Sequence, residues 1–182
     1  MQFSAISVVA DVTHCVTMDA KLPGDLVYVL GVTRNELGGS EYYDHLGYIG
    51  KNVPQVDTKA FLALYQALAA TIREDLPSSV HGIYAGGLGV HLALTAMGGD
   101  CGMTVDLAKL PQKDISRDDQ RLFSESAGRF IVTIDAARKE TFEKMLHGLP
   151  FAHIGRVEEE SRLMVHGSKA QSIINLTVND LK

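Results

Sequence analysis

Three short clusters of glycine, serine and charged residues in this sequence are suited to binding an anion such as a phosphate. The first is Glu36-Leu-Gly-Gly-Ser-Glu41, which follows an apolar run. The paired glycines Gly38 and Gly39 let backbone N–H groups converge on a concave site, and Ser40 is a suitable N-cap for a helix that begins at Glu41. N–H groups at a helix N-terminus attract a phosphate or a carboxylate. The alternative is a tight turn followed by a capped helix.

The second cluster, Gly86-Gly87-Leu88-Gly89, lies between a predicted strand and a predicted helix. It invites comparison with the dinucleotide-binding fingerprint, and Asp106 falls about where the ribose-binding acid would be. The fingerprint is incomplete, because Leu92 stands where a third small residue is needed, and the sequence has no Gly-Lys-Ser/Thr of a P-loop. The alternative to a phosphate role for Gly86 and Gly87 is that they let the helix pack closely against the sheet.

The third cluster is Phe123-Ser-Glu-Ser-Ala-Gly-Arg-Phe130, at the entrance to a predicted strand. It holds two hydroxyls, a carboxylate and a guanidinium, from Ser124, Ser126, Glu125 and Arg129. These groups suit a polar ligand. The alternative is a loop whose hydroxyls satisfy local backbone groups.

No pattern in the sequence indicates a catalytic apparatus. No serine lies in a nucleophile elbow, and the histidines lack the paired spacing of metal ligands. His81, His91 and Cys101 could meet in space, but histidines beside strands and on helices are more often structural. Cys15 and Cys101 fit no metal or redox spacing and are typical of reduced thiols in a cytoplasmic protein. We therefore expect no catalytic residue and no metal site in this chain.

Length and composition indicate one ordinary globular domain. The chain has 182 residues, of which 46% are hydrophobic and 21% charged, enough for one sizeable core. The formal net charge of -5, without a run of Lys and Arg, argues against a nucleic-acid partner. The sequence shows neither a signal peptide nor an apolar stretch long enough for a membrane helix. We expect a cytoplasmic location.

Strands and helices that alternate along the chain would position the three clusters. Alternation or unbroken apolar runs predict strands at residues 3–12, 26–30, 80–84, 103–107, 129–134, 152–157, 162–165 and 172–176, with a short extended piece at 16–20. Apolar spacings of three and four predict a helix from Asp57 to Glu74, ended by Pro77. We also predict a helix that opens in Ala85–Gly89 and runs to about Met97, a short helical turn at 118–123 and an amphipathic helix at 136–147.

This order of elements predicts an α/β protein with α+β character. Helices alternate with strands in the middle, and short strands cluster at the end, which favours helices packed on a mixed sheet over a purely parallel one. Residues 1–182 show no repeat, linker or composition break, so we interpret them as a single domain.

Taken in order, the three clusters resemble a known enzyme family. The stretches "DLVYVLGVTRNELGGSEYY", "GGLGVHLALTAMGGDCGMTVDL" and "LFSESAGRFIVTI" are similar to the C-terminal domain of phosphoribosylformylglycinamidine synthase of the large-subunit type. The opening "AISVVADVTHCVTMDAKLPGD" is similar to the start of that domain, so the resemblance covers nearly the whole chain.

The resemblance implies a three-layer α/β/α domain of the aminoimidazole ribonucleotide synthase C-terminal type, partly like a ferredoxin fold. It also implies that the chain is a fragment of a larger enzyme, and "SESAGR" resembles the second, C-terminal copy of the domain. Two departures bear on ligand contact. Ala127 and Gly128 stand where the first copy continues with glutamine, and Tyr84-Ala85 replaces the family's usual Ser-Asp.

The family's activity implies a role in purine biosynthesis. The full enzyme converts formylglycinamide ribonucleotide, glutamine and ATP into the amidine, with ATP and Mg bound elsewhere and none held tightly by this domain alone. The implied partners are the enzyme's ATP-binding N-terminal domain, its first-half domains, a glutaminase domain or subunit and the ribonucleotide substrate. An isolated domain would be inactive and would tend to self-associate. The alternatives are a non-catalytic domain that shapes the nucleotide cleft of another superfamily member, and a dinucleotide-binding oxidoreductase domain.

Overall fold

The apolar run Leu26–Leu30 forms strand β1 in the interior of the main sheet of the computed structural model, which describes residues 4–182. All five side chains are buried. Strand β6 (Arg129–Ile134) pairs antiparallel with β1 on one side and β7 (Phe151–Glu158) pairs antiparallel with it on the other. Because helices cover both faces, β1 needs no polar alternation, and its predicted bounds are confirmed.

Seven strands within residues 4–182 form the main sheet, in the order β3-β6-β1-β7-β4-β8-β9. Neighbours run antiparallel, except that β4 and β8 are parallel, so the predicted mixed sheet is confirmed. A small parallel pair, β2 (Thr33–Arg34) with β5 (Gln112–Lys113), was not predicted. The remaining strands of the main sheet are β3 (Pro77–Ile83), β4 (Gly102–Asp106), β8 (Arg162–His166) and β9 (Ser172–Thr177).

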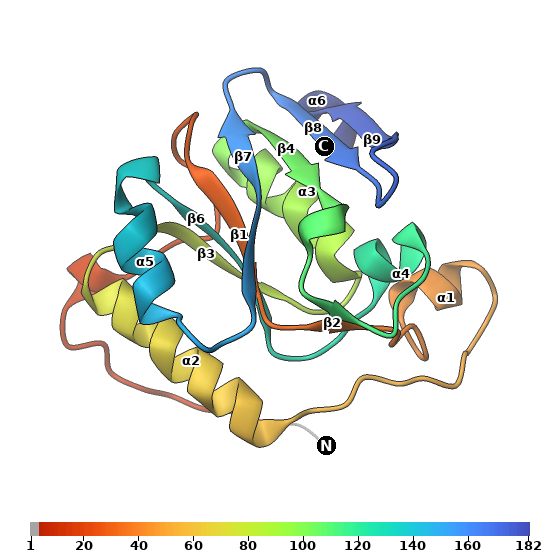
Figure 1. Ribbon diagram of the computed structural model, residues 1–182, viewed down its shortest axis with the longest axis horizontal. Coiled ribbons are helices and arrows are strands. Elements are labelled where there is room, and N and C mark those ends of the chain that lie inside the picture. Colours follow the sequence, from red (N-terminus) through yellow and green to blue (C-terminus); the bar gives the residue numbers. More distant parts are fainter. Residues whose placement is uncertain (1–3) are drawn as a thin grey trace.

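Two hydrophobic cores, one on each face of the sheet, give the fold its three layers. Helices α2 (Thr58–Arg73) and α5 (Lys139–Met145) cover one face, and α3 (Gly87–Gly99) covers the other (Figure 1). Alternate side chains of β1 enter different cores: Tyr28 packs with the α2 and α5 side chains, whereas Val27 packs with those of α3. The predicted α/β/α arrangement is confirmed.

Most helices lie close to their predicted positions. Asp57 caps α2 by accepting a hydrogen bond from the N–H of Ala60. The helix ends at Arg73, one residue before the predicted end at Glu74, and Pro77 begins β3. The helix predicted at 136–147 divides into a 3-10 turn and α5. None of the helices within residues 4–182 combines the length and apolar character needed to cross a membrane. The other helical elements are η1 (Val12–His14), α1 (Glu41–His45), η2 (Leu107–Lys109), α4 (Asp118–Phe123), η3 (Ala136–Arg138) and α6 (Val178–Leu181).

The strand predicted at residues 3–12 is wrong. Residue 3 lies outside the described residues, and residues 4–9 have no regular structure, with the Ile6 side chain fully exposed at 100%. The piece at 16–20, predicted as extended and not as a strand, forms none, and the carbonyl of Thr17 accepts a hydrogen bond from the N–H of Val80 on β3. Residues rich in β-branched side chains have the propensity for a strand, but a strand forms only where a neighbour supplies a ladder of hydrogen bonds.

Candidate functional site

The three clusters come together at one junction of loops. We call this region the loop junction and define it as residues 36–41, 84–87 and 123–129. A single oxygen, Oε1 of Glu125, accepts hydrogen bonds from the N–H of Glu41 at 2.9 Å and from the N–H of Gly86 at 2.8 Å. Those N–H groups begin helices α1 and α3, so one carboxylate neutralises the positive ends of both. The sequence suggested that a phosphate could bind to the N–H groups at these helix N-termini. In the structure the carboxylate of Glu125 binds to them instead.

Arg129 is a buried clamp beneath the loop junction. Its side chain is 1% exposed and donates to the carbonyl of Ser126 at 2.9 Å, to the hydroxyl of Thr33 at 2.9 Å and to the carbonyl of Ser124. Burial lowers its pKa to about 10, while the nearby carboxylates of Glu36 and Glu125 oppose this shift. Arg129 thus holds the turn at residues 124–128 from inside.

The two serines of the third cluster also bond within the fold. The hydroxyl of Ser126 accepts from the N–H of Arg34 at 3.0 Å, and that of Ser124 accepts from the N–H of Glu36 at 3.3 Å. Local backbone partners were the alternative for these hydroxyls, but the partners in the structure lie 92 and 88 residues away in the chain. The Ser124 hydroxyl thus joins the first cluster to the third, and the Ser126 hydroxyl joins β2 to the third.

The linker between α1 and α2, residues 46–57, lies over the first glycine pair. The N–H of Gly38 donates to the carbonyl of Asn52 at 2.8 Å, and the N–H of Gly39 donates to that of Ile49 at 2.7 Å. A Cβ on Gly38 would lie 2.8 Å from the carbonyl carbon of Asn52, and Gly39 has a φ of +69°. Ser40 caps α1, as predicted, by accepting from the N–H of Tyr43 at 3.2 Å. Gly38 thus makes room for the linker, whereas Gly39 provides the positive φ of the turn.

The second glycine pair makes room for a helix. Gly86 and Gly87 have φ values of +87° and +70°, and a Cβ on Gly87 would lie 2.6 Å from the carbonyl oxygen of Leu122 in α4. We predicted close packing against the sheet, but the close neighbour of Gly87 is α4. A stacked pair of rings, Tyr42 and Phe123 with centroids 4.5 Å apart, joins α4 to α1.

Two histidines meet below the second glycine pair. Nδ1 of His91 and Nε2 of His81 are 2.7 Å apart, and Nε2 of His91 accepts from the N–H of Tyr84 at 3.1 Å. Both side chains are buried, and burial lowers the pKa of each imidazole from 6.5. Cys101 hydrogen-bonds to the carbonyl of Gly99. Within residues 4–182 no three His, Cys, Asp or Glu side chains gather in a way that could hold a metal ion.

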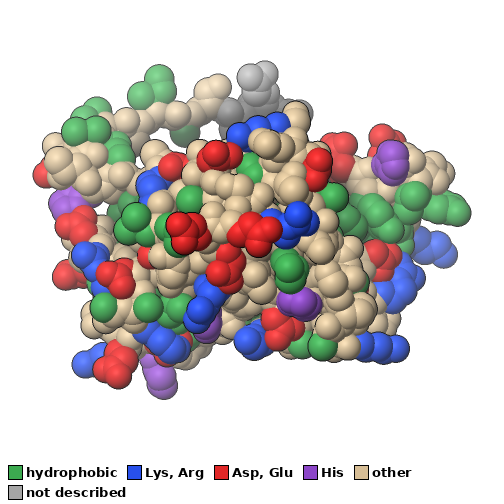
Figure 2. Space-filling view, turned by 90° about the horizontal axis from the view of Figure 1, so that it is seen from above, with side chains coloured by type: hydrophobic (Ala, Val, Ile, Leu, Met, Phe, Trp, Pro, Cys, Tyr) green, Lys and Arg blue, Asp and Glu red, His purple; other side chains and the backbone are tan. Residues whose placement is uncertain are grey.

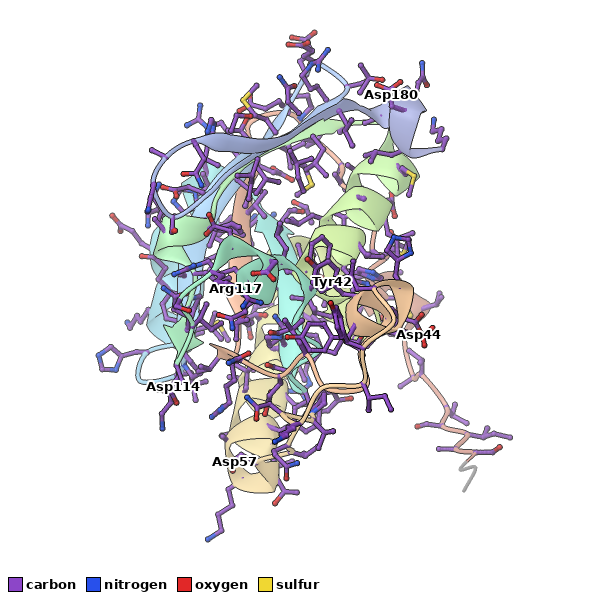
Figure 3. The ribbon with its side chains drawn as sticks, turned by 90° about the vertical axis from the view of Figure 1, so that its right-hand side faces the viewer. Tyr42, Asp44, Asp57, Asp114, Arg117 and Asp180 are labelled. Atoms are coloured by element: carbon purple, nitrogen blue, oxygen red, sulfur yellow. The ribbon has the colours of Figure 1, made fainter. Side chains whose placement is uncertain are left out.

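The surface around the linker is hollowed, and several of its polar residues were not predicted. One hollow of about 340 Å³ and another of about 190 Å³ flank the first glycine pair. Arg117, which lines the larger one, lies on the same side of the molecule as Tyr42 (Figure 3). On the face seen in Figure 2, acidic and basic side chains are interspersed.

Two polar residues of the larger hollow, Lys51 and Asn52, were not predicted, because their only sequence signal is their place in a Gly- and Pro-containing linker. The larger hollow is lined by Asn35, Leu37, Gly38, Tyr43, Gly50, Lys51, Asn52, Arg117 and Gln120.

Comparisons with known proteins agree on one family. Residues 23–168 match the family model described as AIR synthase related protein, C-terminal domain. The chain is 35% identical over 166 residues to phosphoribosylformylglycinamidine synthase subunit PurL of Thermococcus sibiricus (strain DSM 12597 / MM 739), covering 91% of this chain and 23% of that protein. The chain therefore spans about a quarter of the length of this relative.

Solved structures show the same fold. T. maritima PurL complexed with FGAR matches with a TM-score of 0.79 at 20% identity, over 93% of this chain and 30% of that one. The PurLQS structure from Thermotoga maritima matches with a TM-score of 0.78 at 20% identity, over 93% and 28%. The hydrogenase maturation protein HypE in complex with ATP is less similar, with a TM-score of 0.61 at 14% identity, over 87% and 52%.

Proposed function

Because this chain belongs to the AIR synthase related protein, C-terminal domain family, we propose that it serves as a domain of a phosphoribosylformylglycinamidine synthase. The observation that carries the proposal is the 35% identity to a PurL subunit over 91% of the chain. The chain corresponds to about a quarter of that relative, so we propose that residues 1–182 act as one domain of a larger cytoplasmic assembly.

The full enzyme would carry out an ATP-dependent ligation. In the proposed reaction the amide oxygen of formylglycinamide ribonucleotide takes the γ-phosphoryl group of ATP, and ammonia released from glutamine then displaces phosphate to give the amidine. The described residues include no acidic cluster suited to magnesium. We therefore assign ATP, Mg and the reacting groups to the ATP-binding N-terminal domain and the first-half domains, and ammonia supply to a glutaminase.

Within this domain we propose two roles for the nine candidate residues. Ser124, Ser126 and Arg129 hold the loop junction from inside, since their polar atoms already bond within the fold. The surface above Gly39 borders the ligand cleft that the ATP-binding domain completes. The other five candidates shape that border: Gly38, Ser40, Gly86, Gly87 and Glu125.

An oxidoreductase role is disfavoured by Glu125. A dinucleotide would place its pyrophosphate at the N-terminus of α3. There the N–H of Gly86 already donates to the Glu125 carboxylate, which would also repel the ligand.

Exposed apolar side chains indicate where the other domains would pack. Tyr48 and Ile49 in the linker are 65% and 83% exposed, and Leu62 and Tyr65 on α2 are each 54% exposed. An apolar surface of this kind is typical of an interface, so we expect the isolated chain to self-associate. Sedimentation that shows a strict monomer at high concentration would contradict this part of the proposal.

Complementation tests the function. In a bacterium that lacks its own synthase, the 182-residue chain should restore growth without purines only when the remaining domains and the glutaminase are supplied on separate genes. The matched controls are the same genes without this chain and with a chain carrying Gly87→Val. Failure of the complete set, with every polypeptide present in soluble form, would contradict the proposal. So would ATP hydrolysis by the purified chain alone above that of a Ser40→Ala, Ser124→Ala variant.

A further inference from the structure

The two edge strands of the main sheet, β3 and β9, differ in how their outer sides are covered. β3 begins with Pro77, which has no N–H, and the N–H of Val80 donates to the carbonyl of Thr17 in the N-terminal segment. β9 lies at the other end of the sheet (Figure 1). Within residues 4–182, the backbone groups of residues 172–176 form no backbone hydrogen bond outside the ladder with β8. β9 is therefore open to a further strand.

Two residues of β9 hold the open hydrogen-bonding groups. The N–H of Val178 donates to the carbonyl of Ser161 at 2.9 Å, so the backbone at this position faces β8. Because the facing alternates along a strand, the N–H and C=O of Asn175 face outward. Ile173 is the extra residue of a bulge and has no partner on β8, so its groups are open as well. The open edge of β9 therefore offers the N–H and C=O groups of Ile173 and Asn175.

Apart from the bulge at Ile173, β9 has none of the usual protections of an edge strand. Its residues, Ser-Ile-Ile-Asn-Leu-Thr, include no charge, proline or glycine, and the Leu176 side chain is 43% exposed. Natural edge strands are commonly protected by lysine, by proline or by a covering loop. When two copies of β9 pair, no like charges face each other across the strands, so the strand is suited to pairing with itself.

The charges beside the two ends of β9 are opposite in sign. At the β8–β9 loop, Lys169 forms no salt bridge within residues 4–182. At the α6 end, Asp180 forms none with the described residues either, and the exposed Glu159 in the β7–β8 turn adds negative charge. Antiparallel pairing of two copies brings the loop end of one strand to the α6 end of the other, so opposite charges meet, whereas parallel pairing brings like charges together. Other charged side chains near these ends are already paired: Asp118 with Arg121, Arg162 with Glu160, and Lys182 with Asp100.

We propose that β9 pairs antiparallel with β9 of a second copy of this chain, about a two-fold axis at Ile174, and joins the two main sheets edge to edge. In this register Ile173 of each chain exchanges hydrogen bonds with Asn175 of the other, which uses the open groups of both residues. Ile174 faces Ile174 of the second copy as an apolar cross-strand pair. The pairing goes beyond the proposed ligase role and uses neither the linker nor α2. Complementation can therefore fail while β9 pairs, and the reverse.

Sedimentation of the 182-residue chain over a range of concentrations measures the pairing. We expect the wild-type chain to form dimers and Asn175→Pro to raise the dissociation constant of the dimer about tenfold or more, because proline removes an outward N–H that β8 does not use. Asn175→Ala is the matched control, since it loses the 2.7 Å hydrogen bond from Arg162 to the side chain but keeps the backbone N–H, and its dimer should match wild-type. Ile49→Ser, which removes an exposed apolar side chain from the linker, should also leave the β9 dimer intact.

A disulfide tests the register. Residues opposite each other at the axis of an antiparallel pair have Cα atoms about 4.5 Å apart, which is within the range of a disulfide. In a chain with Cys15→Ser and Cys101→Ser, Ile174→Cys should therefore form a cross-linked dimer on mild oxidation. Leu176→Cys should not, since its two copies would lie about 13 Å apart along the strands.

Three results would overturn the proposal. The first is a wild-type chain that stays monomeric at millimolar concentration. The second is a dimer that Asn175→Pro leaves intact and Ile49→Ser dissociates, which would place the contact at the linker. The third is equal cross-linking of Ile174→Cys and Leu176→Cys. If circular dichroism shows that Asn175→Pro fails to fold, the two cysteine variants decide.

Discussion

Two glycine pairs of this chain, Gly38-Gly39 and Gly86-Gly87, are alike in sequence but support different neighbours. Gly86-Gly87 brings the start of α3 against α4, and a Cβ on Gly87 would lie within 2.6 to 2.7 Å of backbone atoms in α4. Gly38-Gly39 carries the linker, and a Cβ on Gly39 would meet nothing within 4 Å. A Gly-Gly pair beside a strand therefore does not identify a phosphate site, because the chain's own backbone and a glutamate can take up its N–H groups.

The largest difference between the two glycine pairs should appear when Gly87 receives a side chain. Gly87→Val combines an unfavourable positive φ with a clash against the α4 backbone, which cannot move without disturbing the core at Leu122. We expect a loss of about 3 kcal/mol or more in the free energy of unfolding. Urea denaturation measures it. Gly148→Val is the control, since Gly148 has a φ of +83° and open space, and an equal loss there would show that α4 plays no part.

The Glu125 carboxylate bonds to the backbone next to both glycine pairs. Its removal should therefore destabilise the starts of α1 and α3 together. Glu125→Ala removes a charged acceptor from the N–H groups of Glu41 and Gly86, and we expect a loss of about 2 kcal/mol, with a smaller loss for Glu125→Gln. Amide hydrogen exchange at both positions provides the readout. Faster exchange at only one of them would mean that the two loops are held separately.

A fall in pH should lower the stability of the region around Gly86-Gly87 and leave the region around Gly38-Gly39 unchanged. Burial lowers the pKa of His81 and His91 below 6.5, so below that pH the unfolded chain binds more protons and stability falls as the pH drops towards the lowered values. Glu125 and Arg129 act on His91 in opposite directions. Between about pH 7.5 and about pH 5.5 we expect a loss of about 1 kcal/mol. His81→Gln should reduce this dependence, whereas the exposed His147→Gln should preserve it; equal slopes in all three proteins would contradict the assignment.

The smallest effect is expected at Gly39. Gly39→Ala introduces only the strain of a positive φ into open space, which costs about 1 kcal/mol. Gly38→Ala should instead displace the linker, because its Cβ would lie 2.8 Å from Asn52. NMR shifts of residues 49–55 would separate the two variants. Large linker shifts in Gly39→Ala would mean that both glycines carry the linker equally.

Local sequence predicted the elements well where the pattern and the environment agree. The bounds of β1, α4 and β6 were predicted correctly because an apolar run or a short helical turn is a local signal. The N-terminal strand was wrong because a strand needs a partner, which composition does not supply. The β2–β5 pair was missed for the converse reason, since two residues on each side offer no periodicity.

The loop junction was predicted only in part. Its three clusters were found from glycine and serine composition, but their mutual hydrogen bonds span 39 to 88 residues and depend on the tertiary fold. Nothing local distinguishes Glu125, which bonds two helix ends, from Glu41 on the surface. Glu36 was part of a quoted motif, yet nothing local shows that its Oε1 accepts from the N–H of Gln55 in the linker while its buried Oε2 has no donor among the described residues.

The position of β1 in the sheet has a consequence for how the chain folds during synthesis. Its partners, β6 and β7, begin at Arg129 and Phe151, so this strand leaves the ribosome more than a hundred residues ahead of both. Closing such long loops is entropically costly and slows folding. The five consecutive apolar residues of β1 therefore stay without strand partners in the nascent chain until β6 and β7 are synthesised. During that interval they are a natural binding site for a chaperone.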